Sequence, residues 1–136
     1  MKIQPSNKRA LLKAALGTIE SDMVITNVQL VNVITGEIYP ADVFVYDGMI
    51  AHVEYKEPGK ELSKAKQVVD GEGRYLIPGF IDAHEHIESS MMTPRNFAKG
   101  VIPNGTTTVI TDPHEIANVA GCDGITYMMQ ATKDLP

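Results

Sequence analysis

The sequence predicts an α/β protein with a β-rich amino-terminal part, residues 1–77, followed by a βαβ unit, residues 78–136. Two observations lead to this fold class. Residues 22–55 are rich in β-branched side chains and contain turn residues at hairpin spacing. Residues 80–111 instead have the pattern strand, helix, strand, and the first of these strands runs directly into two histidines one residue apart. Ligand sites in parallel α/β folds gather at the carboxyl ends of strands, which draws attention to these histidines.

Composition and charge narrow the functional classes. The 136 residues are 43% hydrophobic and 21% charged, as in an ordinary globular domain. The net charge of −5 and the lack of a basic cluster argue against a nucleic-acid partner. Neither a signal peptide nor a membrane span is recognisable, and the single cysteine, Cys122, cannot form an internal disulfide. We therefore expect a cytoplasmic protein without a membrane partner, in which Cys122 is small, inert and partly buried.

The first predicted element is a short amphipathic helix between Pro5 and Gly17. Ser6 can cap it, the leucines and alanines that follow have helical spacing, and Gly17 can end it. We expect this helix to cover a downstream surface and to keep its lysines and arginine in solvent.

A meander of three strands is predicted next. Residues 23–34 form the first strand, and a turn at residues 35–37 leads to a second strand over residues 41–46. Asp47-Gly48 suits the positive φ angles of a type I′ turn, and the third strand follows over residues 49–54. His52 lies in this third strand, where we expect a structural role because no second ligand type lies at useful spacing.

Two further short strands complete the β-rich part. A charged connection from Lys56 to Lys66 includes Pro58-Gly59 and leads to a strand at residues 68–70. A turn at residues 71–73 then precedes a strand at residues 75–77.

The βαβ unit begins after Pro78-Gly79 with a strand from Phe80. Thr93 can cap a helix that starts at Pro94 and carries Phe97, Ala98 and Val101. Residues 106–111 have the β-branched density of a buried strand, so the two strands should be parallel with a right-handed crossover. Residues 121–130 predict the start of another helix.

His84 and His86 are candidate metal ligands. Side chains at positions i and i+2 of a strand point to the same side, so the two imidazoles should converge while Glu85 faces the other way. Two neutral imidazoles can supply part of a transition-metal shell, which other residues must complete. A His-x-His pair can also be incidental, but the strand end and the nearby carboxylate of Asp82 favour a metal site.

A second polar cluster, Asp112, His114 and Glu115, follows the neighbouring strand, and Glu88 follows the histidines. These four residues form an active-site loop that contacts metal or substrate, or else a loop stabilised by the Asp-Pro turn. Ser89 and Ser90 should satisfy backbone groups instead of acting as nucleophiles, since no base is placed beside them. The sequence has neither a phosphate-binding glycine loop nor a Gly-x-Ser-x-Gly elbow.

Residues 77–86 resemble the first barrel strand of the amidohydrolase superfamily. Residues 87–94 and 103–119 are similar, nearly residue for residue, to the adenine deaminase family within it. The resemblance implies that residues 1–77 form part of a β-sandwich, the urease-alpha-like composite domain. It also implies that residues 78–136 begin a metal-dependent TIM barrel that is incomplete in this chain.

The resemblance further implies hydrolysis of adenine to hypoxanthine and ammonia in purine salvage. Water would be activated on a divalent metal, manganese or iron, with zinc possible, and His84 and His86 would be ligands. The other ligands and the proton-transfer residue of the family have no counterpart here, so no catalytic set is complete. We expect an amino-terminal portion of a larger homo-oligomeric enzyme acting on a small purine, inactive by itself.

Two alternatives remain open at this stage. One is part of another amidohydrolase that opens a cyclic amide, such as a dihydroorotase-like or imidazolone hydrolase. The other is a non-catalytic β-rich interaction module, which would bind its partner without the two histidines.

Overall fold

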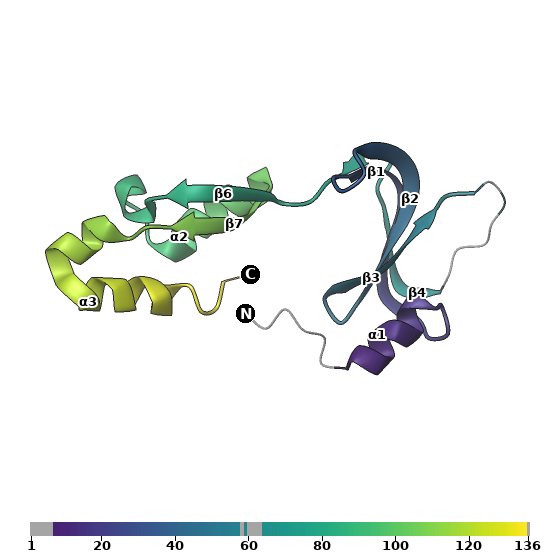
Figure 1. Ribbon diagram of the computed structural model, residues 1–136, viewed down its shortest axis with the longest axis horizontal. Coiled ribbons are helices and arrows are strands. Elements are labelled where there is room, and N and C mark those ends of the chain that lie inside the picture. The colour runs from purple at the N-terminus through teal and green to yellow at the C-terminus, as the bar shows by residue number, and fades with distance from the viewer. Residues whose placement is uncertain (1–6, 58, 60–63, 136) are drawn as a thin grey trace. The chain divides into compact units, whose positions relative to one another are not determined.

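A five-stranded sheet contains all strands of the first part of the chain in the computed structural model, which describes residues 7–57, 59 and 64–135 (Figure 1). The order along the sheet is β3-β2-β1-β4, and β5 also pairs with β1. The antiparallel pairs β1–β2 and β2–β3 confirm the predicted meander, whereas β4 and β5 run parallel to β1. The strands are β1 (Ser21–Asn32), β2 (Glu37–Tyr46), β3 (Met49–Tyr55), β4 (Ala65–Asp70) and β5 (Tyr75–Leu76).

Local turn chemistry determines two features of this sheet. Asp47 and Gly48 have φ angles of 52° and 70°, which confirms the predicted type I′ hairpin between β2 and β3. Asn27, with φ of 56°, lies at an irregularity in the β1–β2 register. The buried carboxylate of Asp42 accepts hydrogen bonds there from the Asn27 N–H (3.0 Å) and the Thr26 hydroxyl (2.5 Å). These bonds stabilise the bulge because a buried carboxylate needs donors.

Helix α1 (Lys8–Ala15) contacts β2 and β3, as expected of an amphipathic helix that covers a downstream surface. Its Ala14 is fully buried, as are Val24 of β1 and Phe44 of β2. The helix is capped by Asn7, whose Oδ1 accepts the N–H groups of Arg9 and Ala10, both at 3.1 Å. The predicted cap, Ser6, lies outside the described residues.

The chain divides between Pro78 and Gly79 into two compact units, called here the sheet unit and the βαβ unit. In the βαβ unit, β6 (Phe80–Glu85) and β7 (Thr106–Thr111) pair in parallel, with helix α2 (Pro94–Val101) between them in the chain. This confirms the predicted strand, helix, strand pattern. Two short 3-10 helices, η1 (Ile87–Ser90) and η2 (Ile102–Asn104), flank α2, and α3 (His114–Ala131) follows β7 (Figure 1).

The helices of this unit agree only in part with the expectations. Helix α2 starts at Pro94 as predicted, but the side chain of Thr93 makes no capping hydrogen bond. Helix α3 begins at His114, so the predicted loop of residues 112–115 extends only through Pro113, and residues 114–120 form a helical segment that was not predicted. At Gly121 the backbone is non-helical (φ 58°, ψ −142°) and bends α3 (Figure 1). Glycine permits this positive φ angle, and the segment that follows it to Ala131 is the helix expected over residues 121–130.

The two parallel strands are largely exposed, although their composition is typical of buried strands. Phe80 is 55% exposed, Ile81 66% and Ile110 58%. The core of the unit consists of Ile87, Phe97 and Met128, with Val101, Val109 and Ile116 packed against it. A sheet of two strands has too little surface to enclose itself, so apolar side chains that do not reach this core remain in solvent. Cys122 is also exposed, which corrects its expected partial burial.

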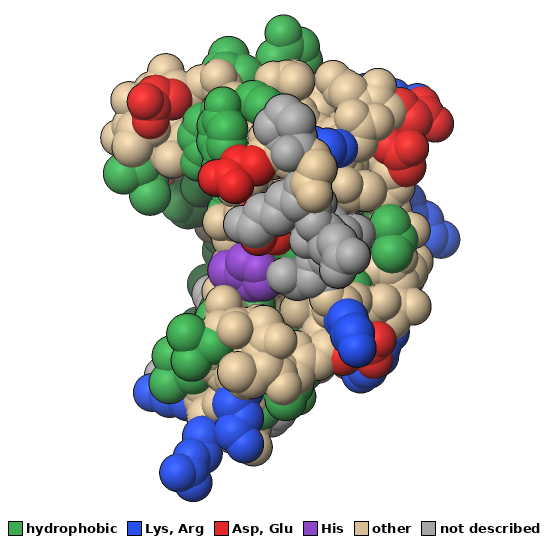
Figure 2. Space-filling view, turned by 90° about the vertical axis from the view of Figure 1, so that its right-hand side faces the viewer, with side chains coloured by type: hydrophobic (Ala, Val, Ile, Leu, Met, Phe, Trp, Pro, Cys, Tyr) green, Lys and Arg blue, Asp and Glu red, His purple; other side chains and the backbone are tan. Residues whose placement is uncertain are grey.

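The surface carries side chains of mixed character. In the space-filling view, hydrophobic side chains reach the surface between acidic and basic ones (Figure 2). Within the described ranges, no helix combines the length and the hydropathy needed to cross a membrane.

Candidate metal centre

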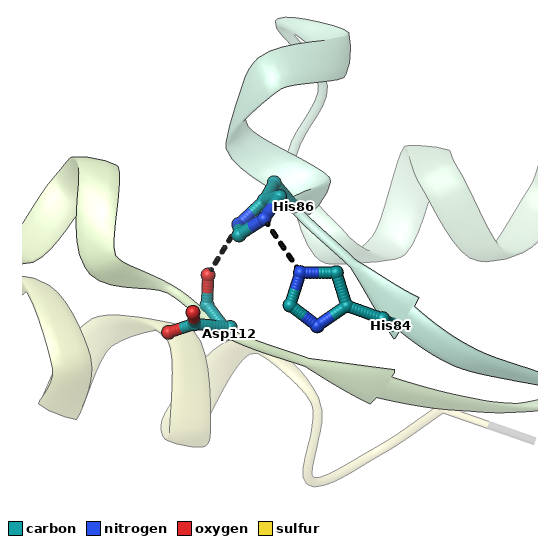
Figure 3. A group of neighbouring side chains, drawn as sticks. All are labelled: His84, His86 and Asp112. Atoms are coloured by element: carbon teal, nitrogen blue, oxygen red, sulfur yellow. Dashed lines mark hydrogen bonds between the residues drawn. The ribbon is translucent and has the colours of Figure 1, made fainter.

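His84 and His86 meet at the carboxyl end of β6. Their Nε2 atoms are 3.0 Å apart, and the two rings are nearly perpendicular, with centroids 4.7 Å apart (Figure 3). His86 lies one residue beyond the strand, with φ of −112° and ψ of 88°, yet its ring still turns to the side of His84. The N–H of His84 donates to Asp82 Oδ1 at 3.2 Å. The expected convergence of the two imidazoles is therefore present, with His84 exposed and His86 half-buried.

Asp112 joins the histidines from the end of β7. Its N–H donates to the carbonyl oxygen of Glu85 at 3.0 Å, which continues the pairing of the two strands by one residue. Its own carbonyl oxygen lies 2.7 Å from His86 Nδ1 (Figure 3). A carbonyl oxygen only accepts hydrogen bonds, so this contact assigns the proton of a neutral His86 ring to Nδ1. The lone pair is then on Nε2, the atom that faces His84.

The three side chains can share one metal ion. One ligand atom from each of His84, His86 and Asp112 lies within 4.8 Å of the other two. Imidazole nitrogens and a carboxylate oxygen are a donor set suited to divalent transition metals. His114 extends this cluster, since its Nδ1 lies 3.2 Å from Asp112 Oδ2 and its ring centroid 4.6 Å from that of His86.

The other two predicted loop residues, Glu88 and Glu115, have hydrogen-bonding roles that the sequence did not indicate. Glu88 Oε1 accepts the backbone N–H groups of Glu115 (3.2 Å) and Ile116 (3.4 Å). Glu115 Oε1 accepts the hydroxyl of Ser89 at 2.5 Å. Capping signals are read from residues three or four apart, and this cap joins residues 27 and 28 apart. No local pattern could therefore have revealed it.

Two further expectations concern residues outside the metal centre. The Ser90 hydroxyl donates to the carbonyl oxygen of Ile87 at 2.6 Å, which confirms a backbone-satisfying role, whereas Ser89 bonds a side chain. His52 stacks on Phe44 in the sheet unit, with ring centroids 4.2 Å apart. This contact agrees with the structural role expected for His52.

The chain matches curated adenine deaminases along most of its length. It is 51% identical over 126 residues to the adenine deaminase of Desulfatibacillum aliphaticivorans, which covers 93% of this chain and 21% of that protein. It is 47% identical over 120 residues to that of Listeria welshimeri, covering 88% of this chain and 20% of the relative. The chain thus spans about a fifth of the length of these relatives.

Solved structures and a family model point the same way. N-acyl-D-glutamate deacylase from Bordetella bronchiseptica, complexed with zinc and a phosphonate inhibitor, matches with a TM-score of 0.56 and 28% identity, over 68% of this chain and 19% of that one. L-hydantoinase from Arthrobacter aurescens matches with a TM-score of 0.53 and 28% identity, over 68% and 21%. The model of the Amidohydrolase family matches residues 75–136. Residues 75–136 therefore belong to the Amidohydrolase family, whose members are metal-dependent enzymes, and the chain as a whole is similar to adenine deaminases.

Proposed function

We propose that this chain is the amino-terminal portion of a metal-dependent adenine deaminase, which hydrolyses adenine to hypoxanthine and ammonia in purine salvage. Identity of 51% and 47% to curated adenine deaminases supports this substrate. The structural neighbour named for a cyclic amide, L-hydantoinase, is 28% identical. The higher sequence identity to adenine deaminases favours a purine substrate over a cyclic amide. The two histidines at a strand end likewise favour an enzyme over a non-catalytic interaction module.

The observation that carries the proposal is the approach of two imidazole nitrogens at the end of β6. His84 Nε2 and His86 Nε2 are 3.0 Å apart. Two imidazole nitrogens this close together could both bind one divalent transition metal. Manganese or iron is proposed from the resemblance to adenine deaminases, with zinc possible.

The residues of this chain have distinct tasks at that ion. His84 and His86 bind it through Nε2, and the carbonyl oxygen of Asp112 keeps the His86 ring in the tautomer that leaves Nε2 free. The Asp112 carboxylate is within reach as a further ligand. When bound, the metal supplies Lewis-acid chemistry and lowers the pKa of coordinated water. The remaining ligands and the proton-transfer residue come from other segments of the longer polypeptide.

The exposed strands fit the same proposal. Phe80, Ile81 and Ile110 are each more than half exposed, and further barrel strands of the longer polypeptide would cover them. The sheet unit would be one part of a β-sandwich, and the βαβ unit would begin a TIM barrel. We further propose a cytoplasmic homo-oligomer, and the net charge of −5 is consistent with a small-molecule substrate in place of nucleic acid.

Metal titration of the 136-residue chain tests the ligand assignment. We expect saturable binding of Co²⁺, followed by its visible absorption bands, and of Mn²⁺, followed by calorimetry. His84→Ala and His86→Ala should each weaken binding by at least roughly 10-fold, because each removes a ligand. His52→Ala is the matched control, since it removes an imidazole from the sheet unit.

A longer polypeptide that contains this sequence tests the reaction. It should release ammonia from adenine and should not open the rings of hydantoin or dihydroorotate, a reaction that would form carbamoyl amino acids without ammonia and that is followed by chromatography. Both histidine variants should abolish the ammonia release. Ring opening of a cyclic amide, with no ammonia from adenine, would contradict the substrate. Equal metal affinity of all three histidine variants would contradict the ligand assignment.

A further inference from the structure

We propose that Glu88 is a positioning residue for His86. It anchors the start of α3 and so holds the carbonyl oxygen of Asp112 against His86 Nδ1. The consequence for metal affinity rests on the proposed function, but the effect on the His86 ring does not.

Glu88 acts as the N-cap of a helix that lacks one of its own. The first N–H groups of an α-helix have no partner within the helix, and a side chain at the N-cap position commonly accepts those of the second and third residues. In α3 the N-cap position is Pro113, which makes no side-chain cap hydrogen bond. Glu88 Oε1 accepts those two donors instead, from Glu115 at 3.2 Å and Ile116 at 3.4 Å. Its carboxylate also lies favourably at the positive end of the helix.

The cap completes a set of contacts around His86 that links the segment after β6 to the segment after β7. Glu88 is two residues after His86, and the residues that it caps are three and four after Asp112. Within this set of contacts, the Asp112 carbonyl oxygen lies 2.7 Å from His86 Nδ1. The bond from Ser89 to Glu115, at 2.5 Å, joins the same two segments again. Movement of the start of α3 would therefore displace the carbonyl oxygen that determines which nitrogen of His86 is protonated.

The burial of one Glu88 carboxylate oxygen argues that position, more than stability, explains this residue. Its Oε2 is buried and has no hydrogen-bond partner among the described residues. An unsatisfied buried oxygen is costly, whereas a serine or aspartate at position 113 could cap α3 locally without burying a carboxylate. A cap supplied from η1 does what a local cap cannot, because it ties α3 to the segment that carries His86.

The experiment compares Glu88→Ala, which removes the acceptor, with Glu88→Gln, which keeps one acceptor oxygen. Val101→Ala is the matched control, since Val101 packs on the core of the same unit from α2. The ring ¹⁵N shifts of His86, recorded by NMR well above the pKa of imidazole, report which nitrogen is protonated in the metal-free chain. Co²⁺ titration of the same samples reports the affinity of the site.

We expect the wild-type and Glu88→Gln chains to show a His86 ring protonated at Nδ1. Glu88→Ala should shift the ring towards Nε2 protonation and weaken Co²⁺ binding by about 10- to 100-fold. Val101→Ala should lower the melting temperature without changing the tautomer. An unchanged His86 ring in Glu88→Ala would overturn the proposal, as would an equal change in Val101→Ala. If the wild-type chain binds no Co²⁺, the metal assignment fails, and the ring shifts alone still decide the role of Glu88.

Discussion

Replacing Gly79 by alanine should disturb the pairing of β6 with β7. A Cβ atom at this position would lie 2.1 Å from Oγ1, 2.4 Å from Cγ2 and 2.8 Å from Cβ of Thr107. Rotation of the threonine side chain can move the first two atoms, but its Cβ is fixed to the backbone. The strands must therefore separate near the Phe80 N–H, which donates to the Gly105 carbonyl oxygen at 2.8 Å. Overpacking of this kind costs about 1–3 kcal/mol.

Amide hydrogen exchange of β6 and β7 measures this cost within the βαβ unit. Because 1.4 kcal/mol corresponds to a factor of ten, exchange through opening of the unit should accelerate roughly 5- to 150-fold in Gly79→Ala. The double variant Gly79→Ala/Thr107→Ala should recover part of the protection, since it removes Oγ1 and Cγ2 but leaves the Thr107 Cβ position occupied.

Gly100→Ala is the matched control for this experiment. It introduces the same methyl group in α2, where nothing lies within 4 Å of the new Cβ. It should stabilise the unit by about 0.5–1 kcal/mol, because glycine in a helix has the larger conformational entropy to lose. Protection of Gly79→Ala equal to wild type, or no recovery in the double variant, would refute the steric argument.

Two further predictions concern the sheet unit. Phe44→Ala should lower the free energy of unfolding, measured in urea, by about 3–5 kcal/mol, because Phe44 is fully buried. Ile34→Ala is the control: this side chain is 92% exposed, so the free energy of unfolding should change by less than ~0.5 kcal/mol. Similar losses in the two variants would contradict the core assignment. Hydrogen bonds from the backbone of Glu72 and then from the side chain of Asn27 hold the pKa of Asp70 below its ordinary value of 3.8. The resulting stabilisation is complete above pH 3.8 and is lost as the pH falls through the lower pKa of the folded state. Asp70→Asn should therefore reduce the loss of stability on acidification. A pKa of the wild-type Asp70 carboxyl at or above 3.8, measured by NMR titration, would contradict this prediction.

Local chemistry accounts for the features that could be predicted from the sequence. Asp47-Gly48 tolerates positive φ at both positions, so its turn type follows from two residues. Pro94 marks the first turn of α2 because a proline is tolerated there. The period of two along a strand was enough to predict that the rings of His84 and His86 converge.

Features that depend on distant neighbours could not be predicted in this way. The β-branched composition of residues 106–111 correctly indicated a strand but not its exposure, because burial depends on how many layers cover the strand. The first segment of α3, before the kink at Gly121, was not predicted, since its cap comes from Glu88 and Pro113 offers no capping side chain.

The sequence by itself determined the type of the main elements, the pairing of two histidines on one side of β6, and the kinship with amidohydrolases, because each depends on residues close together in the chain. Tertiary structure decided what holds those histidines. His86 is oriented by the backbone carbonyl oxygen of residue 112, a group that every amino acid carries and that leaves no mark in a sequence. Its place beside His86 follows from the parallel register of β6 and β7 and from the cap at Glu88. Both are contacts between segments more than 20 residues apart, which only the folded chain brings together.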